Sequence, residues 1–299
     1  MTRFLFAFLT LTLLAPAPAW AQSDDAVDSE PGLLVLAPDR GFLGNDKARD
    51  VVADVREHTE NVGLAFATSE ETTSNLSDAL SSIDTEDGVV VLPLFLSAHH
   101  TLYQTARAAM PDVEAGVQWS APFGQSYLSE EILFDRVEAL SSRPDDEALV
   151  VIGYGAGDKA SADSIQADLQ PAATRAAEKC GLAGGGSAVV QYARSAPSKA
   201  SRAAMKAAAK QVKSKASEHD RVIVVPYNLG MEYTSMMASW AWMQRQFRSM
   251  DGVVANGTGV LPHPNVERWV RRTATAYRPL SPDDVGVIAV PHGSEYNWN

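Results

Sequence analysis

Cysteine, long apolar runs and positive charge are all scarce in this sequence of 299 residues. Its single cysteine, Cys180, cannot form an internal disulfide, so the fold must be stabilised by other means. After the N-terminal segment, no stretch reaches the roughly 18 consecutive apolar residues of a transmembrane helix. There are 25 Lys and Arg residues against 37 Asp and Glu residues, a net charge of −12. Nucleic acids and anionic membranes bind basic surfaces, so we expect neither as a partner.

The N-terminal segment has the pattern of a cleaved signal peptide spanning residues 1–21. Arg3 is followed by the apolar run Phe4–Leu14, which is too short to span a bilayer, and Ala19–Ala21 has the small-residue pattern of a cleavage site. We therefore expect an exported protein, periplasmic or secreted, with no membrane anchor after cleavage. Residues 22–32 are predicted to be a polar linker.

Alternating apolar strands and amphipathic helices predict an α/β fold, with mainly parallel sheets and helices on both faces. The first predicted strands are Leu33–Pro38, Val62–Ala67 and a run that begins at Val89; predicted helices between and after them cover residues 45–58, 73–83, 102–110 and 127–142. A second series has predicted strands at 148–153, 184–190 and 221–227, and predicted helices at 162–180, 199–217 and 231–247.

The two series are predicted to be an internal duplication. Arg221–Tyr227 repeats the run that begins at Val89, and a proline stands in the matching place at Pro93 and Pro226. A third strand start follows at Val285 and leads into His292. We therefore predict unit 1 at residues 33–145, unit 2 at 146–283, and at 284–299 a strand and turn that resemble the start of a third unit.

Two adjacent imidazoles, His99 and His100, follow the buried run that begins at Val89. Ligands of open α/β sheets bind beyond the carboxyl ends of strands, and neutral imidazole is a common ligand of transition metals. The position therefore favours a metal site, although polar residues at a helix start would give the same pattern. The other histidines outside strand ends, His58, His219 and His263, are expected to be surface residues.

The strand-His-Gly-Ser pattern at His292 and the run Pro93-Leu-Phe-Leu-Ser-Ala-His99 resemble the ATP-independent class II chelatases. That family includes the sirohydrochlorin cobaltochelatases and ferrochelatases. The resemblance implies tandem chelatase-like units in which strand-end histidines hold a metal ion for insertion into a tetrapyrrole. It thereby implies a divalent ion, Co²⁺ or Fe²⁺, as substrate or ligand, a tetrapyrrole partner, and a role such as cobalamin biosynthesis.

The sequence also departs from the family pattern. Unit 1 has Pro38-Asp39-Arg40-Gly41 where His-Gly is expected, and unit 2 has Tyr154-Gly155. The resemblance implies His99, His100 and His292 as metal ligands, with His99 and His292 also as catalytic residues. The need to take up protons adds Glu295, three residues after His292, as a catalytic carboxylate, and Asp39, next to the place of the missing histidine, is a candidate oxygen ligand of the metal. The rival interpretation of Asp39 is turn formation.

Three functions stay open at this point. The first is metal insertion into a sirohydrochlorin-type macrocycle by a lyase of the chelatase type. The second is a non-catalytic carrier of a metal or tetrapyrrole with a degenerate site, which the loss of His-Gly in both units favours. The third is a structural protein whose site has decayed completely. The sequence gives no oligomeric state.

Two weaker motifs accompany the histidines. The turn Gly153–Gly157 follows a strand, as a phosphate-binding loop would, but it lacks the full G-x-G-x-x-G spacing. The Met- and Trp-rich segment between Met236 and Phe247 has helical spacing and is more typical of a core or interface than of a tetrapyrrole platform.

Overall fold

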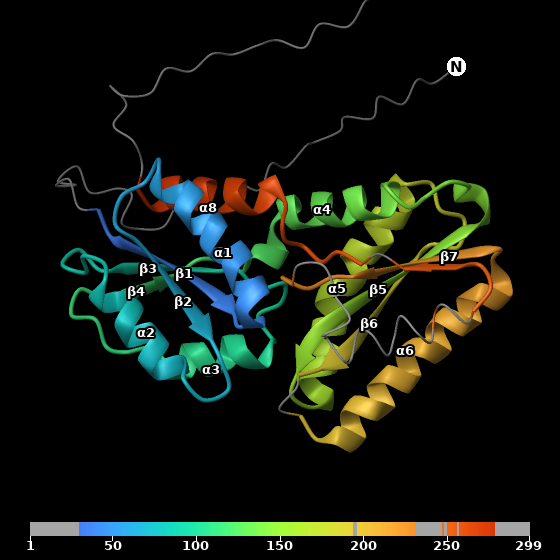
Figure 1. Cartoon of the computed structure of the whole chain (residues 1–299), viewed down its shortest axis with the longest axis horizontal. Helices are drawn as coiled ribbons and strands as arrows, with labels where there is room; N and C mark the ends of the chain where they lie inside the picture. Colours follow the sequence, from blue (N-terminus) through green and yellow to red (C-terminus); the bar gives the residue numbers. More distant parts are fainter. Residues whose placement is uncertain (1–29, 194–195, 231–246, 248–249, 256, 279–299) are drawn as a thin grey trace, which may run out of the picture. The chain divides into compact units, whose positions relative to one another are not determined.

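The computed structural model describes residues 30–193, 196–230, 247, 250–255 and 257–278. Over this part of the chain, strands and helices alternate as predicted, and the α/β class with two tandem units is confirmed (Figure 1). No helix among the described residues is both long and apolar enough to cross a membrane.

The first half of the chain contains four strands and four α-helices. In chain order these are β1 (Gly32–Pro38), α1 (Gly41–Arg56), β2 (Val62–Ala67), α2 (Thr72–Ser81), β3 (Val89–Pro93), α3 (Thr101–Ala109), β4 (Val117–Trp119) and α4 (Tyr127–Glu138). Short 3₁₀ turns, η2 (Phe123–Gln125) and η3 (Pro144–Asp146), come before and after α4.

The second half repeats the series. It contains β5 (Glu147–Ala156), α5 (Lys159–Lys179), β6 (Gly186–Tyr192), α6 (Ser198–Glu218), β7 (Arg221–Pro226), β8 (Val253–Ala255) and α8 (Pro264–Tyr277). The helix predicted at residues 231–247 lies outside the described residues except for Phe247, which is buried. The strand predicted from Val285 also lies outside them.

Each half forms a four-stranded sheet, and every strand pair is parallel. The strand orders are β2-β1-β3-β4 and β6-β5-β7-β8, which are the same order in the numbering of each half. The central strands are buried on both faces, which explains their unbroken Val and Leu runs. The topology thus supports the duplication inferred from sequence.

The two matching prolines have the same backbone role in both sheets. Pro93 lies beside Leu36, and Pro226 lies beside Ile152. The residue after each proline then donates its N–H to that neighbour's carbonyl, at 2.8 Å in the first sheet and 2.9 Å in the second. Proline is tolerated here because each strand ends at this point and the ladder continues through the next residue.

Helices cover both faces of each sheet. Helices α2 and α3 contact each other beside one face of the first sheet, and α6 covers the outer face of the second (Figure 1). Helix α4, from the end of the first half, packs against α5 and β7 of the second. Helix α8, from the second half, packs against α1 and β3 of the first. Each half therefore completes the core of the other, and one buried cluster contains residues of both sheets.

A buried carboxylate joins the two halves at the start of the second sheet. The Glu147 side chain is fully buried and accepts hydrogen bonds from the Ser141 hydroxyl at 2.5 Å and from Arg221 Nη1 at 2.6 Å. The backbone N–H groups of Ser142 and Arg143 also donate to it. Burial raises the pKa of Glu147, but these hydrogen bonds outweigh it and hold the pKa below its usual range.

We expect Glu147→Gln to reduce the free energy of unfolding by about 3 kcal/mol at pH 7, because the substitution leaves Arg221 without its buried partner. The folded-state pKa of Glu147 is lowered, so its contribution is present above the unfolded pKa and is lost as the pH falls through the folded pKa. The measurement is guanidinium unfolding at pH 7 and at acidic pH. The exposed Glu138→Gln variant of α4 is the control. Equal stability of the two variants at pH 7 would contradict the prediction.

Candidate functional site

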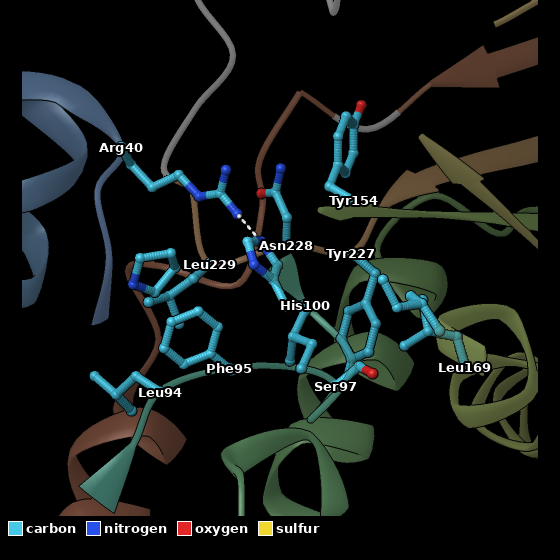
Figure 2. A pocket seen from close by; sticks show the side chains of 13 residues that line it. Arg40, Leu94, Phe95, Ser97, His100, Tyr154, Leu169, Tyr227, Asn228 and Leu229 are labelled. Atoms are coloured by element: carbon cyan, nitrogen blue, oxygen red, sulfur yellow. Dashed lines mark hydrogen bonds between the residues drawn. The ribbon is translucent and has the colours of Figure 1, made fainter. Parts of the chain in front are cut away.

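A small pocket lies where the carboxyl ends of strands from both halves meet. It is lined by residues that follow β1 and β3, by residues at the end of β5, and by residues that follow β7, with α5 closing one side (Figure 2). Its cavity of about 10 Å³ holds roughly one water molecule. Among the described residues that line it, Arg40 is the one that carries a full charge.

Among the described histidines, His100 is the one that lines this pocket. Its side chain is 6% exposed, and its ring packs edge-on against Phe95 with 5.2 Å between ring centroids. As the N-cap of α3, it accepts a hydrogen bond at Nδ1 from the Leu102 N–H at 3.1 Å. Its Nε2 lies 3.4 Å from Nη2 of Arg40 (Figure 2). Arg40 precedes α1, so the contact joins the ends of β1 and β3.

The surroundings of His100 fix its protonation. Burial, and secondly the charge of Arg40, lower the pKa of His100 to about 3, so the ring is neutral near pH 7. The Leu102 N–H and the Arg40 guanidinium can both only donate, whereas the neutral ring has a single lone pair. Whichever ring nitrogen carries the proton, the remaining lone pair faces one of these two donors and is not available to a metal ion.

The other predicted ligands lie elsewhere. His99 is exposed to solvent, and its backbone N–H donates to the Ser97 hydroxyl at 3.0 Å. Asp39 is exposed and accepts hydrogen bonds from the Gly41 N–H at 3.1 Å and from Nδ2 of Asn45 at 2.6 Å. These local hydrogen bonds are those of a turn-forming residue, which was the alternative to a metal ligand for Asp39.

His292 and Glu295 lie outside the described residues. Within the described part of the chain, no group of three or more His, Cys, Asp or Glu side chains is arranged to hold a metal ion. The described residues of the pocket do not fit a metal ion, because Arg40 brings positive charge and His100 has no available lone pair.

Sequence reasoning missed two residues that define the pocket. Arg40 stands directly before Gly41, which is the place where the family pattern has histidine before glycine. The second is Gly155, whose φ of +105° suits glycine and whose missing side chain leaves room for the His100 ring. A Cβ on Gly155 would lie 2.0 Å from Cδ2 of His100.

The glycine-rich turn before α5 therefore has a packing role. Asp158 caps α5 by accepting the Ser161 N–H at 2.8 Å, which places a carboxylate where a phosphate-binding loop would receive its anion. Another link between the halves is the hydrogen bond from the Ser97 hydroxyl to Asp168 of α5, at 2.5 Å. Cys180 is not activated as a nucleophile, since burial raises the pKa of its thiol to about 11.

No protein-family model and no curated protein matches the sequence. Solved structures do match. The sirohydrochlorin chelatase SirB from Bacillus subtilis subspecies spizizenii, in complex with cobalt, is 14% identical with a TM-score of 0.54; the match covers 83% of this chain and 97% of that one. SirB from Bacillus subtilis with Fe³⁺ is also 14% identical, with a TM-score of 0.53, and 83% of this chain and 96% of that one are covered.

A third similar structure is DR2241 from Deinococcus radiodurans, described as a multi-domain protein with structural similarity to chelatases and two additional novel domains. It is 16% identical with a TM-score of 0.52, and the match covers 85% of this chain but only 56% of that one. This chain thus spans a little over half the length of DR2241. At these identities the matches establish the fold alone, and the predicted chelatase-like fold is confirmed.

The contact between Gly155 and His100 is tested by Gly155→Ala. We expect a loss of about 3 kcal/mol in unfolding free energy, because the new Cβ meets the imidazole and the backbone conformation is strained. Gly185→Ala is the control: it also has a positive φ, of +61°, but no atom lies within 4 Å of its Cβ position, and a loss of about 1 kcal/mol is expected.

The double variant Gly155→Ala/His100→Ala shows whether the loss of stability comes from the clash with the His100 ring or from the backbone conformation of residue 155. Thermal or guanidinium unfolding of the four proteins of the cycle gives the coupling energy between the two positions. We expect a coupling of about 1 kcal/mol or more, because removing the ring relieves the clash. Strictly additive effects would mean that Gly155 is required for its backbone conformation alone.

Proposed function

We propose that this protein binds a tetrapyrrole of the sirohydrochlorin class without inserting a metal ion. In this proposal it is an exported binding or carrier protein with the fold of a chelatase. The observation that carries the proposal is the contact of Arg40 with His100 at the strand ends, where a metal-inserting site would need free imidazoles. The fold supports the ligand class, because SirB has the same fold and is a sirohydrochlorin chelatase.

Electrostatics oppose a metal ion at this place. Arginine stays protonated at any physiological pH, so its charge is permanent. Two unit charges about 4 Å apart repel by about 4 kcal/mol at an effective dielectric constant of about 20, and a divalent ion doubles that figure. Coordination at Nε2 of His100 needs the lone pair of the ring there, so the proton would be on Nδ1, which could then not accept the Leu102 N–H that caps α3. Both effects favour binding without insertion.

Metal insertion of Co²⁺ or Fe²⁺ is the second candidate. The observation that favours it is the exposed imidazole of His99, which stands at the strand end and caps nothing. In this alternative, His99 acts with His292 and Glu295 to hold the ion and to accept the two protons that leave the pyrrole nitrogens. Imidazole suits both tasks, because its ordinary pKa is near neutrality.

An absorbance assay separates the two candidates. The mature protein is titrated with sirohydrochlorin and then supplied with Co²⁺, with the Bacillus subtilis SirB protein as the positive control for insertion. We expect the spectrum of sirohydrochlorin to shift on binding and then to stay that of the metal-free macrocycle, because Arg40 excludes the ion. His99→Ala and His292→Ala should bind the macrocycle as the wild type does.

Cobalt insertion at a rate comparable with that of SirB would overturn the proposal. If that rate fell by about tenfold or more in His99→Ala or His292→Ala, the enzyme alternative would take its place. A protein that neither binds nor metallates sirohydrochlorin would exclude both candidates and leave a chelatase-like fold without tetrapyrrole chemistry.

Export is the second part of the proposal. Residues 1–21 have the positive, apolar and small-residue segments of a signal peptide, and the cleavage pattern ends at Ala21. Expression of the full chain in a Gram-negative host should therefore yield a periplasmic protein that begins at Gln22, as read by intact mass and N-terminal sequencing. An Ala19→Leu/Ala21→Leu variant should stay uncleaved. A cytoplasmic product that retains Met1 would refute export.

A further inference from the structure

A groove of about 780 Å³ runs between α4 and α8, away from the strand-end pocket. Its volume falls within the roughly 300–1,000 Å³ of small-molecule sites. One wall is α4, which contributes Tyr127, Glu131 and Asp135; the other is α8, which contributes Arg268 and Arg272. Nothing in the sequence pattern pointed to this place.

The groove concentrates positive charge on a chain whose net charge is −12. Three arginines of α8 line it: Arg268, Arg271 and Arg272. Arg271 is paired with Glu267 at 3.2 Å. Among the described residues, no carboxylate pairs with Arg268 or Arg272; they donate instead to the side-chain oxygens of Asn265 and Tyr127, at 3.2 and 2.9 Å.

The acidic side chains of the groove are already engaged. Glu131 accepts hydrogen bonds from Lys179 at 2.7 Å. Asp135 lies 3.0 Å from Nε2 of His263, whose Nδ1 accepts the Asn265 N–H and so caps the start of α8. The positive end of the α8 dipole also faces this side. The balance of charges therefore favours an anionic ligand.

An exposed aromatic ring stands beside the two arginines. Tyr127 is 57% exposed, and among the described residues only Phe42 is another exposed large hydrophobic side chain. The guanidinium carbon of Arg272 lies 5.5 Å from the centre of the Tyr127 ring, so the ring and the cation form one continuous surface. Such a surface suits a planar conjugated ligand, because both the aromatic face and the guanidinium plane stack on flat rings.

The base of the groove is rigid. Buried Leu128 lines it, and Asn265 of α8 is buried and donates from Nδ2 to the Leu128 carbonyl at 3.4 Å. Trp269 of α8 packs edge-on against Phe123, with 5.3 Å between ring centroids. These contacts hold the two helices that carry the arginines and Tyr127 side by side, so the groove does not have to form on binding.

We propose that the α4–α8 groove binds a planar macrocycle that carries carboxylate side chains, with Arg268 and Arg272 pairing with the carboxylates and Tyr127 stacking on the ring. This inference rests on the proposed tetrapyrrole binding and assigns it a place outside the strand-end pocket, whose cavity of about 10 Å³ has no room for a macrocycle.

The test is a fluorescence titration of the mature protein with uroporphyrin, a planar polycarboxylate. We expect Arg268→Ala/Arg272→Ala to raise the dissociation constant by at least about tenfold and Tyr127→Ala to raise it by about threefold. The matched control is Arg202→Ala/Lys206→Ala, which removes the same charge from exposed positions of α6 and should change the constant less than about twofold. Circular dichroism checks that each variant is folded.

Three outcomes would overturn the inference. Equal losses in the groove variant and in the α6 control would mean non-specific charge attraction. Unchanged binding in the groove variant, with a large loss in Arg40→Ala, would move the macrocycle to the strand-end pocket and leave the proposed function intact. A wild-type protein that binds neither uroporphyrin nor sirohydrochlorin would remove the proposed function as well, so the two failures are distinguishable.

Discussion

The structure depends on the exchange of helices between its two halves. Helix α4 of the first half packs against α5 and β7, and α8 of the second half packs against α1 and β3. As a result, one apolar cluster contains buried residues of both sheets. Neither half covers its inner sheet face with its own helix alone, because α8 supplements α1 on the first sheet and α4 supplements α5 on the second. The strand ends of the two sheets are therefore held around a common small pocket.

Close packing at this pocket decides what its chemistry can be. The His100 ring is confined by Phe95 and by Gly155, and its Nδ1 is occupied by the cap of α3. A histidine held in this way is a structural residue, even though its position at a strand end is the one expected of a ligand. Arg40 adds a permanent positive charge beside it. Packing and charge together are therefore the basis on which we propose that this pocket does not hold a metal ion.

Sequence reasoning predicted the strands well because their apolar runs are buried on both faces. Such a run predicts a buried strand even when the neighbouring strands are not known. It could not decide between His99 and His100, since adjacent residues differ only in the direction that tertiary packing gives them. It treated His263 as a surface residue, whereas the side chain caps α8 and is only 12% exposed. Helix α8 itself was missed, although Val266, Trp269, Val270 and Ala274 have helical spacing.

Charge distribution carries the remaining argument about function. A protein that handles a metal ion would gain from carboxylates near its imidazoles, and this acidic chain has many to offer. Yet no carboxylate among the described residues lines the strand-end pocket, where Arg40 stands, and three arginines line the α4–α8 groove beside Glu131 and Asp135. Guanidinium groups recognise carboxylates by paired hydrogen bonds and repel cations. Because cationic side chains stand at both concave surfaces, we propose the acidic macrocycle, rather than the ion, as the ligand.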